Sequence, residues 1–309
     1  MTPVEPDPPG TLRCPAPAKL NLFLHVIGRR ADGYHELQSA FQLIDLADTV
    51  ILTPRSDGRI VRRDPLPDVP PEADLAVRAA RLLETEARTR GRDVPGVDIG
   101  IAKAIPMGGG LGGGSSDAAT ILLALNRLWQ LGLPRQRLME LGLTLGADVP
   151  FFVFGRNAFA EGVGERLVAI DLPECWYAVI HPGVHVPTAA IFGAPDLTRN
   201  TKAIKISDFS ATLDRDAGGP WFGHNDLEAV AATRFAPVAQ ALQWMQGFVQ
   251  LEHQSGQLDR ARMTGSGACV FGRFARAEAA RRAVTGLPGG WSGWVCRSQA
   301  RHPLVDWAV

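Results

Sequence analysis

A short segment rich in glycine is the densest chemical signal in this sequence. It comprises Pro106, Met107, Gly108, Gly109, Gly110, Leu111, Gly112, Gly113, Gly114, Ser115 and Ser116, here called the glycine loop. A backbone without side chains can approach an anion closely and point its N–H groups at the oxygens. An apolar stretch with helical spacing follows at once, so the positive end of a helix adds to the attraction, with Ser115 or Ser116 as the expected N-cap. The segment therefore predicts a phosphate-binding loop.

Other interpretations of the glycine loop can be weighed against the residues around it. Gly108, Gly110 and Gly113 match G-x-G-x-x-G, but a dinucleotide-binding fold needs an acidic residue about 20 positions further on, and residues 126–135 contain none. A Walker loop is excluded because the chain has no Gly-Lys pair. A flexible surface loop is the remaining alternative, and the helix that follows directly argues against it.

Phosphoryl transfer needs a residue that orients or deprotonates the attacking hydroxyl, together with groups that offset phosphate charge. Asp148 stands between a predicted helix and an apolar run, where a carboxylate can accept a proton. Its alternative role is a cap or turn residue before Pro150. Lys19 is either a solubilising lysine on a strand or a cation that keeps Asp148 ionised and stabilises the transferred group. Asn21 shares a strand face with Lys19.

Two further segments could contact a ligand. Tyr34 and His35 follow a turn and pair an aromatic ring with an imidazole, which suits stacking on a flat ring and hydrogen bonding to it, although an isolated histidine is more often structural. Residues 263–269 form a second glycine cluster before a predicted strand, and they could close over phosphates or substrate.

The elements that must position these residues follow from hydrophobic periodicity. Strands are predicted over residues 19–27, 39–46, 50–53, 97–103, 176–181, 269–274 and 293–297. Helices are predicted over residues 74–88, 118–129 and 134–145. Residues 208–223 are polar and punctuated by glycine and proline, which predicts a long loop.

Length and composition set the wider frame. A chain of 309 residues suggests about two domains, and we place them at residues 1–165 and 166–309, with residues 1–10 expected to be a disordered tail. Hydrophobic residues are 46% and charged residues 21% of the chain, and the formal net charge is zero. A neutral chain has no overall field to attract nucleic acid or an anionic membrane, so neither is expected as a partner.

Cysteine spacing and hydropathy bear on the expected location. The four cysteines form no C-x-x-C pair of the redox or zinc type, which favours a reduced cytoplasmic setting. No apolar run approaches the roughly 18 residues of a membrane helix, and the N-terminus lacks the layout of a signal peptide. We therefore expect a cytoplasmic protein.

Several segments, taken in order, resemble the GHMP kinases, the family of galactokinase, homoserine kinase and mevalonate kinase. They are residues 17–24, 32–35, 106–116, 145–150, 161–165, 187–188, 191–192 and 264–269, so the resemblance spans nearly the whole chain. The resemblance implies a two-domain α+β fold, with an N-terminal domain like ribosomal protein S5 and a C-terminal ferredoxin-like domain.

The resemblance extends to a function, because the segments at 17–24, 32–35 and 145–150 are similar to those of family members that act on a cytidine diphosphate-linked polyol. It implies ATP-dependent phosphorylation of the 2-hydroxyl of 4-diphosphocytidyl-2-C-methyl-D-erythritol, in the non-mevalonate route to isoprenoid precursors. Small molecules are thus the expected partners, and the chain itself would be a monomer or a homodimer. Mg²⁺ is expected with the nucleotide, without an identified metal ligand.

Residue roles follow from the same resemblance, position by position. Asp148 is similar to the catalytic base of the family and Lys19 to its partner lysine, while residues 106–116 would wrap the ATP phosphates. Substrate contacts are expected from Asn21 near the reacting hydroxyl, from Tyr34 and His35 on the cytosine ring, and from Thr188 and Phe192 on the cytidine side. One position departs from the pattern: Asp74 stands where the family commonly has an Asn that faces the nucleotide, so adenine contacts and nucleotide preference could differ here.

Overall fold

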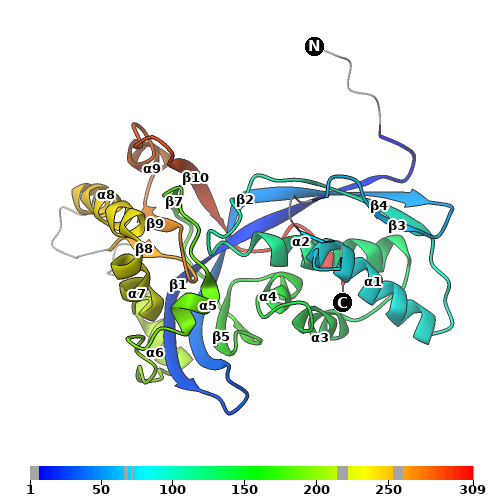
Figure 1. The fold of residues 1–309 in the computed structure, drawn as a ribbon, viewed down its shortest axis with the longest axis horizontal. Helices are drawn as coiled ribbons and strands as arrows, with labels where there is room; N and C mark the ends of the chain where they lie inside the picture. Colours follow the sequence, from blue (N-terminus) through cyan, green and yellow to red (C-terminus); the bar gives the residue numbers. More distant parts are fainter. Residues whose placement is uncertain (1–6, 66–68, 71, 214–221, 253–259, 309) are drawn as a thin grey trace.

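The computed structural model describes residues 7–65, 69–70, 72–213, 222–252 and 260–308, and it forms two lobes joined by long strands (Figure 1). The first six residues of the expected disordered tail lie outside these ranges. Within them, none of the helices combines the length and apolar character that a bilayer crossing requires.

A long antiparallel pair of strands runs through both lobes. β1 (Leu12–Arg29) pairs with β2 (His35–Arg55) along its whole length, so the two strands predicted separately at residues 39–46 and 50–53 are one continuous strand. Three register shifts interrupt the pairing, between residues 17 and 18, 21 and 23, and 26 and 28. Such bulges bend a strand and re-aim its side chains. Both faces of β1 are buried because its residues contribute to three hydrophobic clusters on different sides of the strand.

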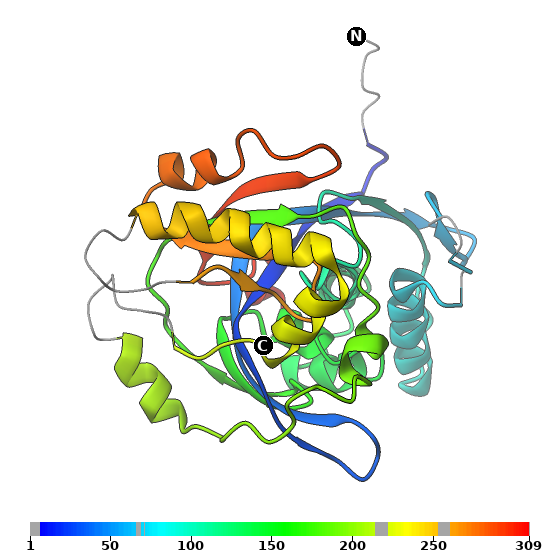
Figure 2. The same cartoon turned by 60° about the vertical axis from the view of Figure 1, so that its left-hand side comes forward.

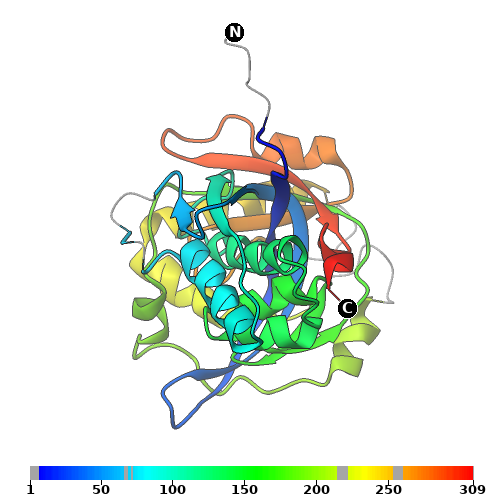
Figure 3. The same ribbon diagram turned by 90° about the vertical axis from the view of Figure 1, so that its right-hand side faces the viewer.

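The N-terminal lobe packs helices against this pair. β4 (Gly96–Ala102) pairs antiparallel with β2 and parallel with β3 (Ile60–Arg62), while β5 (Ala158–Gly162) pairs with the other half of β2 and with β6 (Arg166–Ala169). Four helices lie against the strands (Figure 3): α1 (Leu75–Thr89), α2 (Gly113–Leu128), α3 (Arg135–Leu143) and α4 (Val149–Phe154). Their apolar sides form one core with β1, β2 and β4, so the three predicted helices are confirmed.

The C-terminal lobe is a second sheet with helices over it. β10 (Ser292–Gln299) and β9 (Val270–Phe274) flank β7 (Trp176–His181), and β8 (Arg262–Met263) is at the edge. α8 (Ala236–Glu252) and α9 (Ala277–Ala283) cover one face (Figure 2). The remaining helices are α5 (Thr188–Phe192), α6 (Ile206–Leu213) and α7 (Asp226–Arg234). The predicted loop is wrong over residues 208–213, which belong to α6, and residues 214–221 lie outside the described ranges.

The lobes share strands and chain ends. β10 also pairs with β2, which joins ten strands of the described chain into one sheet. After β10 the chain returns to the N-terminal lobe, where the 3₁₀ helix η1 (Val305–Trp307) follows the core residue Leu304. The proposed division after residue 165 falls in the turn of the β5–β6 hairpin.

Candidate active site

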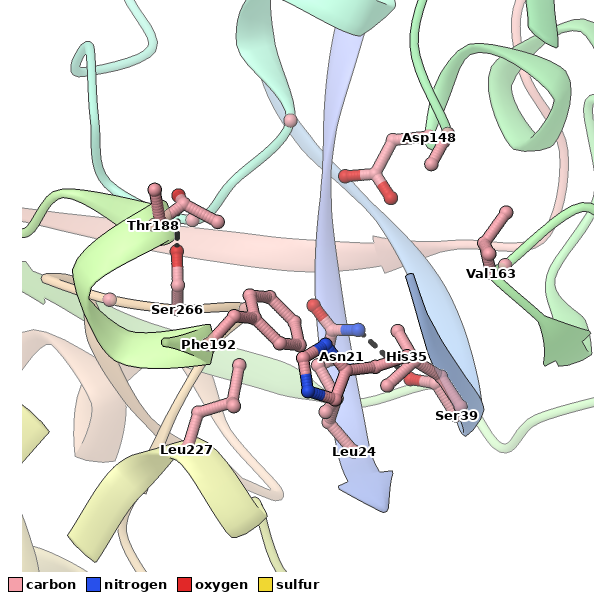
Figure 4. Close-up of a pocket in the computed structure, with 18 of the residues that line it drawn as sticks. Asn21, Leu24, His35, Ser39, Asp148, Val163, Thr188, Phe192, Leu227 and Ser266 are labelled. Atoms are coloured by element: carbon pink, nitrogen blue, oxygen red, sulfur yellow. Dashed lines mark hydrogen bonds between the residues drawn. The ribbon is translucent and has the colours of Figure 1, made fainter. Parts of the chain in front are cut away.

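Two cavities meet at the glycine loop. The larger, about 770 Å³, lies between the lobes (Figure 4) and falls in the range of small-molecule sites. It brings together residues that the sequence scatters over 174 positions: Lys19, Asn21, Tyr34, His35, Gly108, Gly110, Gly112, Ser115, Asp148, Thr188 and Phe192. The smaller cavity, about 370 Å³, is lined by the whole of residues 106–115. Ser116 lines neither, because it is buried and its hydroxyl donates to the Pro17 carbonyl at 2.7 Å.

Backbone hydrogen bonds from distant segments hold the glycine loop in place. Three of them are Ala268 N to Gly108 O at 3.2 Å, Cys269 N to Gly109 O at 3.1 Å and Lys19 N to Leu111 O at 3.0 Å. Gly108, Gly110 and Gly112 have φ values of 68°, 74° and 73°, which favour glycine. The second glycine cluster thus braces the first, which its sequence alone did not indicate.

The N-cap of α2 differs from the expectation. Gly112 occupies it in a left-handed conformation, with no side-chain bond, and the helix already starts at Gly113. The prediction that Ser115 or Ser116 caps this helix is therefore wrong: both lie in its first turn. The positive end of α2 consequently begins within the loop itself, which increases the number of N–H groups near the cavity.

Lys19 and Asp148 form an ion pair at the floor of the larger cavity. The Lys19 Nζ lies 3.4 Å from Asp148 Oδ2 and donates to Asn21 Oδ1 at 2.5 Å. The Lys19 side chain is only 3% exposed, whereas that of Asp148 is 34% exposed. The ring of Phe41 lies 5.4 Å from the ammonium. A buried cation with these partners is no solubilising lysine, so that alternative for Lys19 does not fit.

Asp148 occupies the N-cap position of α4, but its side chain makes no capping hydrogen bond. Figure 4 shows the carboxylate pointing into the cavity. A carboxylate that leaves the helix N–H groups free and remains open to solvent on one side can accept a proton from a bound hydroxyl. Asp148 therefore has the position that its alternative role as a cap describes, but its side chain makes no capping bond and is free for contact with a ligand.

Asn21 is held by two hydrogen bonds that sequence analysis did not predict. Its Nδ2 donates to Ser39 Oγ at 2.9 Å, and its backbone N donates to Thr264 Oγ1 at 3.0 Å. Ser39 in turn donates to the Phe23 carbonyl at 2.6 Å. Since the amide group donates to Ser39, its oxygen faces Lys19. A lone serine on a strand carries no sequence signal for such a role, and Thr264 lies in the second glycine cluster, for which the sequence predicted contact with phosphates or substrate and not with Asn21.

The far end of the larger cavity carries the aromatic residues. The rings of His35 and Phe192 lie 5.1 Å apart with a tilt of 33°, and Tyr34 is 64% exposed. Thr188 and Ser266 share a hydrogen bond of 2.7 Å on one side of the cavity (Figure 4). Burial, followed by the positive charges of Arg199 and Arg29, lowers the pKa of His35 below its ordinary value. The imidazole is therefore neutral near pH 7.

A buried charge cluster underlies the smaller cavity. Lys103 donates to Asp117 at 2.8 Å and also to Asp48, whose other oxygen accepts from the backbone N of Ala104 and Ile105 at 2.6 and 2.8 Å. Burial raises the pKa of Asp117 to about 7, opposed by the Lys103 ammonium and reinforced by the Asp48 carboxylate. This cluster ties the start of α2 to β2 and to the end of β4, and sequence analysis did not find it.

We expect Asp117→Asn to flatten the pH dependence of stability between about pH 4 and pH 7. The folded carboxyl keeps its proton above the ordinary value of 3.8, so the free energy of unfolding falls as pH rises through this window, by up to about 1.4 kcal/mol per unit. An asparagine keeps an acceptor for Lys103 and has nothing to titrate. Urea denaturation of both proteins at pH 5 and pH 8 measures how the free energy of unfolding changes between the two pH values. The same change in the wild type and in the variant would contradict the assignment.

Asp74 also lies at the smaller cavity, and its carboxylate is occupied. One oxygen accepts from Ala76 N at 2.8 Å as the N-cap of α1, and the other accepts from Arg62 Nε at 3.2 Å. The side chains of Asp74 and Arg62 are 7% and 6% exposed. The aspartate that stands here in place of the usual asparagine is therefore paired with a buried arginine, Arg62.

Comparisons with known proteins agree with this geometry. The family described as GHMP kinases N terminal domain matches residues 74–156, which contain the glycine loop and Asp148. The 4-diphosphocytidyl-2-C-methyl-D-erythritol kinase of Thiobacillus denitrificans is 59% identical over 294 residues, 94% of this chain and 97% of the relative. That of Cupriavidus metallidurans is 54% identical over 301 residues, 97% of each chain.

Solved structures extend the likeness to the fold. A crystal structure of 4-(cytidine 5'-diphospho)-2C-methyl-D-erythritol kinase has a TM-score of 0.77 at 36% identity, with 93% of this chain and 99% of that chain covered. A homoserine kinase from Cytophaga hutchinsonii, at 16% identity and a TM-score of 0.63, covers 97% of this chain and 98% of its own, and shares the fold. This chain belongs to the 4-diphosphocytidyl-2-C-methyl-D-erythritol kinases of the GHMP kinase family.

Proposed function

We propose that this chain transfers the γ-phosphoryl group of ATP to the 2-hydroxyl of 4-diphosphocytidyl-2-C-methyl-D-erythritol, in the non-mevalonate route to isoprenoid precursors. The observation that carries this proposal is the Lys19–Asp148 pair at 3.4 Å, placed beside the loop at which the two cavities meet. A nucleotide in the smaller cavity and a polyol in the larger one would have their reacting groups at this junction.

The residues at the junction of the two cavities can supply the proton acceptor and the positive charge that phosphoryl transfer needs. As the hydroxyl oxygen of the substrate attacks phosphorus, Asp148 takes the proton of that hydroxyl. The bond between phosphorus and the bridging oxygen of ADP breaks. Lys19 and the N–H groups of the glycine loop offset the negative charge that spreads over the transferred phosphoryl group. Asn21 accepts a hydrogen bond from Lys19 at 2.5 Å and would lie near the hydroxyl.

The aromatic end of the cavity suits the cytosine ring. Tyr34 is exposed enough to move onto a bound ring, and His35 and Phe192 offer a polar edge and a stacking face. Thr188, at the opposite lip of the cleft, would contact the ribose or the neighbouring phosphate.

Mg²⁺ fits the oxygen donors beside the loop. Within the described ranges, no cluster of three or more histidine, cysteine or acidic side chains could hold a metal. Magnesium bound with a nucleotide needs only one or two protein oxygens, since phosphates and water supply the rest. Ser115 lines both cavities beside the loop, so its hydroxyl would be one such donor, and the ion would neutralise phosphate charge when bound.

A coupled assay of ADP release tests the proposed function. The purified chain is given ATP and 4-diphosphocytidyl-2-C-methyl-D-erythritol, with mevalonate and homoserine in parallel. We expect rapid turnover with the cytidyl substrate alone, because neither of the others has a base for the aromatic end of the cavity. Equal turnover with mevalonate or homoserine, or none with the cytidyl substrate, would refute the proposal.

A further inference from the structure

Arg199 lines the aromatic end of the larger cavity and is fixed by backbone carbonyls. Its two terminal nitrogens donate to three of them: Leu197 O at 3.1 Å, Phe192 O at 2.9 Å and Ala194 O at 2.6 Å. The guanidinium is planar, so these bonds also set the direction of the remaining donor. That donor, Nε, points at His35 Nε2 at a distance of 3.2 Å.

This bond determines where His35 carries its proton. A neutral imidazole has one N–H donor and one acceptor nitrogen, and the bond made by one nitrogen decides the state of the other. Burial and the nearby arginines lower the pKa of His35, so the ring is neutral near pH 7. Because Nε2 accepts from Arg199, the proton must lie on Nδ1. Figure 4 shows this ring at the cavity beside that of Phe192, and none of the described residues hydrogen-bonds to Nδ1.

The position of that proton matters for a pyrimidine base. At N3, cytosine has a lone pair that accepts a hydrogen bond, whereas uracil has an N–H that donates one. A donor on His35 therefore matches cytosine and opposes uracil. A site built around a polar contact rejects the mismatched ligand strongly, because its own polar group is then left unpaired.

We propose that Arg199 is a positioning residue that holds His35 in the Nδ1–H tautomer and thereby selects a cytosine base over a uracil base, an inference that rests on the proposed function. The same guanidinium bonds the carbonyl of Phe192, whose ring contacts His35. One side chain thus orients both the hydrogen-bonding ring and the stacking ring at the nucleobase end of the cavity.

The tautomer can be measured directly in the free enzyme. Two-bond ¹H–¹⁵N correlation spectra of protein labelled at histidine distinguish Nδ1–H from Nε2–H, with His35 assigned from a His35→Gln spectrum. We expect Nδ1–H for His35 in the wild type and a shift towards Nε2–H in Arg199→Gln. A wild-type His35 with its proton on Nε2 overturns the proposal, whatever the variant does.

Two control variants distinguish loss of the Arg199–His35 hydrogen bond from loss of local structure and from loss of positive charge. Arg234→Gln removes another arginine that ties the α5 segment, through Ala190 O at 3.3 Å and Asp196 at 2.7 Å, without touching His35. Arg29→Gln removes a positive charge near His35 without removing a bond to it. Both should keep the Nδ1–H signal. Its loss in either control would overturn the assignment to the Arg199 bond.

Kinetics give the second readout. The ratio of kcat/KM for the cytidyl substrate to that for its uridyl analogue should fall about tenfold in Arg199→Gln, the worth of one hydrogen bond, while KM for ATP stays unchanged. An unchanged ratio overturns the selectivity role. Failure of the wild type to turn over the cytidyl substrate would instead refute the proposed function, and the spectra would still report the tautomer.

Discussion

Replacing Asp148 by Asn is expected to lower kcat by about 10²–10⁴-fold, the usual contribution of a general base, while the affinity for ATP stays close to that of the wild type. The amide has the shape of the carboxylate but cannot take the proton of the attacking hydroxyl. Positioning by the two cavities and charge compensation by Lys19 would remain, so a residual rate should persist.

The surroundings of Asp148 explain why ATP binding should survive. The glycine loop is held by bonds to Lys19 N, Ala268 N and Cys269 N, and none of these involves Asp148. The Lys19 ammonium keeps its bond to Asn21 at 2.5 Å. Asp148 makes no capping bond, so α4 loses no partner. The variant therefore removes a chemical function and leaves the binding surface intact.

ADP release measures kcat, and calorimetric titration with ATP measures the affinity. Asp171→Asn is the matched control, because this carboxyl is fully exposed and its nearest cation is Arg156 at 3.8 Å. We expect wild-type kinetics from the control. An Asp148→Asn enzyme with turnover near that of the wild type would remove Asp148 from the mechanism, and lost ATP affinity would assign it a binding role instead.

Local pattern predicted about half of the described elements, and it did not predict their continuity. Alternating apolar residues found β1, β4, β7, β9 and β10, and helical spacing found α1, α2 and α3. The bulges in β1 and the unbroken length of β2 depend on pairing between the two strands, which no single segment encodes. Helix α6 was missed because Asp208 and the glycines that follow it resemble a loop, while Phe209 is buried in a core formed by distant residues.

The predicted site residues had distinctive types, whereas those that hold them did not. Lys19, Asp148 and the glycine loop combine charge, spacing and glycine content, so the chain reveals them. Arg199 could not be predicted, because its role depends on carbonyls around α5 and on His35, 164 positions away. Lys103 appears as a strand-end lysine until folding places it between two buried carboxylates.

The contact between the two glycine segments could not be read from either one, and it leads to a second large effect. Residues 108–110 and 264–269 are about 150 positions apart, yet their backbones are in direct contact. A Cβ on Gly110 would lie 2.1 Å from the carbonyl oxygen of Thr264, a backbone atom that cannot rotate away. The hydroxyl of Thr264 also accepts a hydrogen bond from the backbone N–H of Asn21 at 3.0 Å. A shift of Thr264 would therefore also move Asn21, which is bonded to Lys19.

Gly110→Ala is therefore expected to lower kcat/KM for ATP by about 100-fold or more, since a shift of about 1 Å in positioning costs this much. Gly132→Ala is the matched control. Gly132 has a similar φ of 64°, and nothing lies within 4 Å of its added Cβ. Each alanine should cost about 1–2 kcal/mol in stability for its left-handed backbone, which denaturation measures. Only Gly110→Ala should lose activity with ATP; if both variants turn over ATP equally well, the contact between the two glycine segments does not shape the nucleotide site.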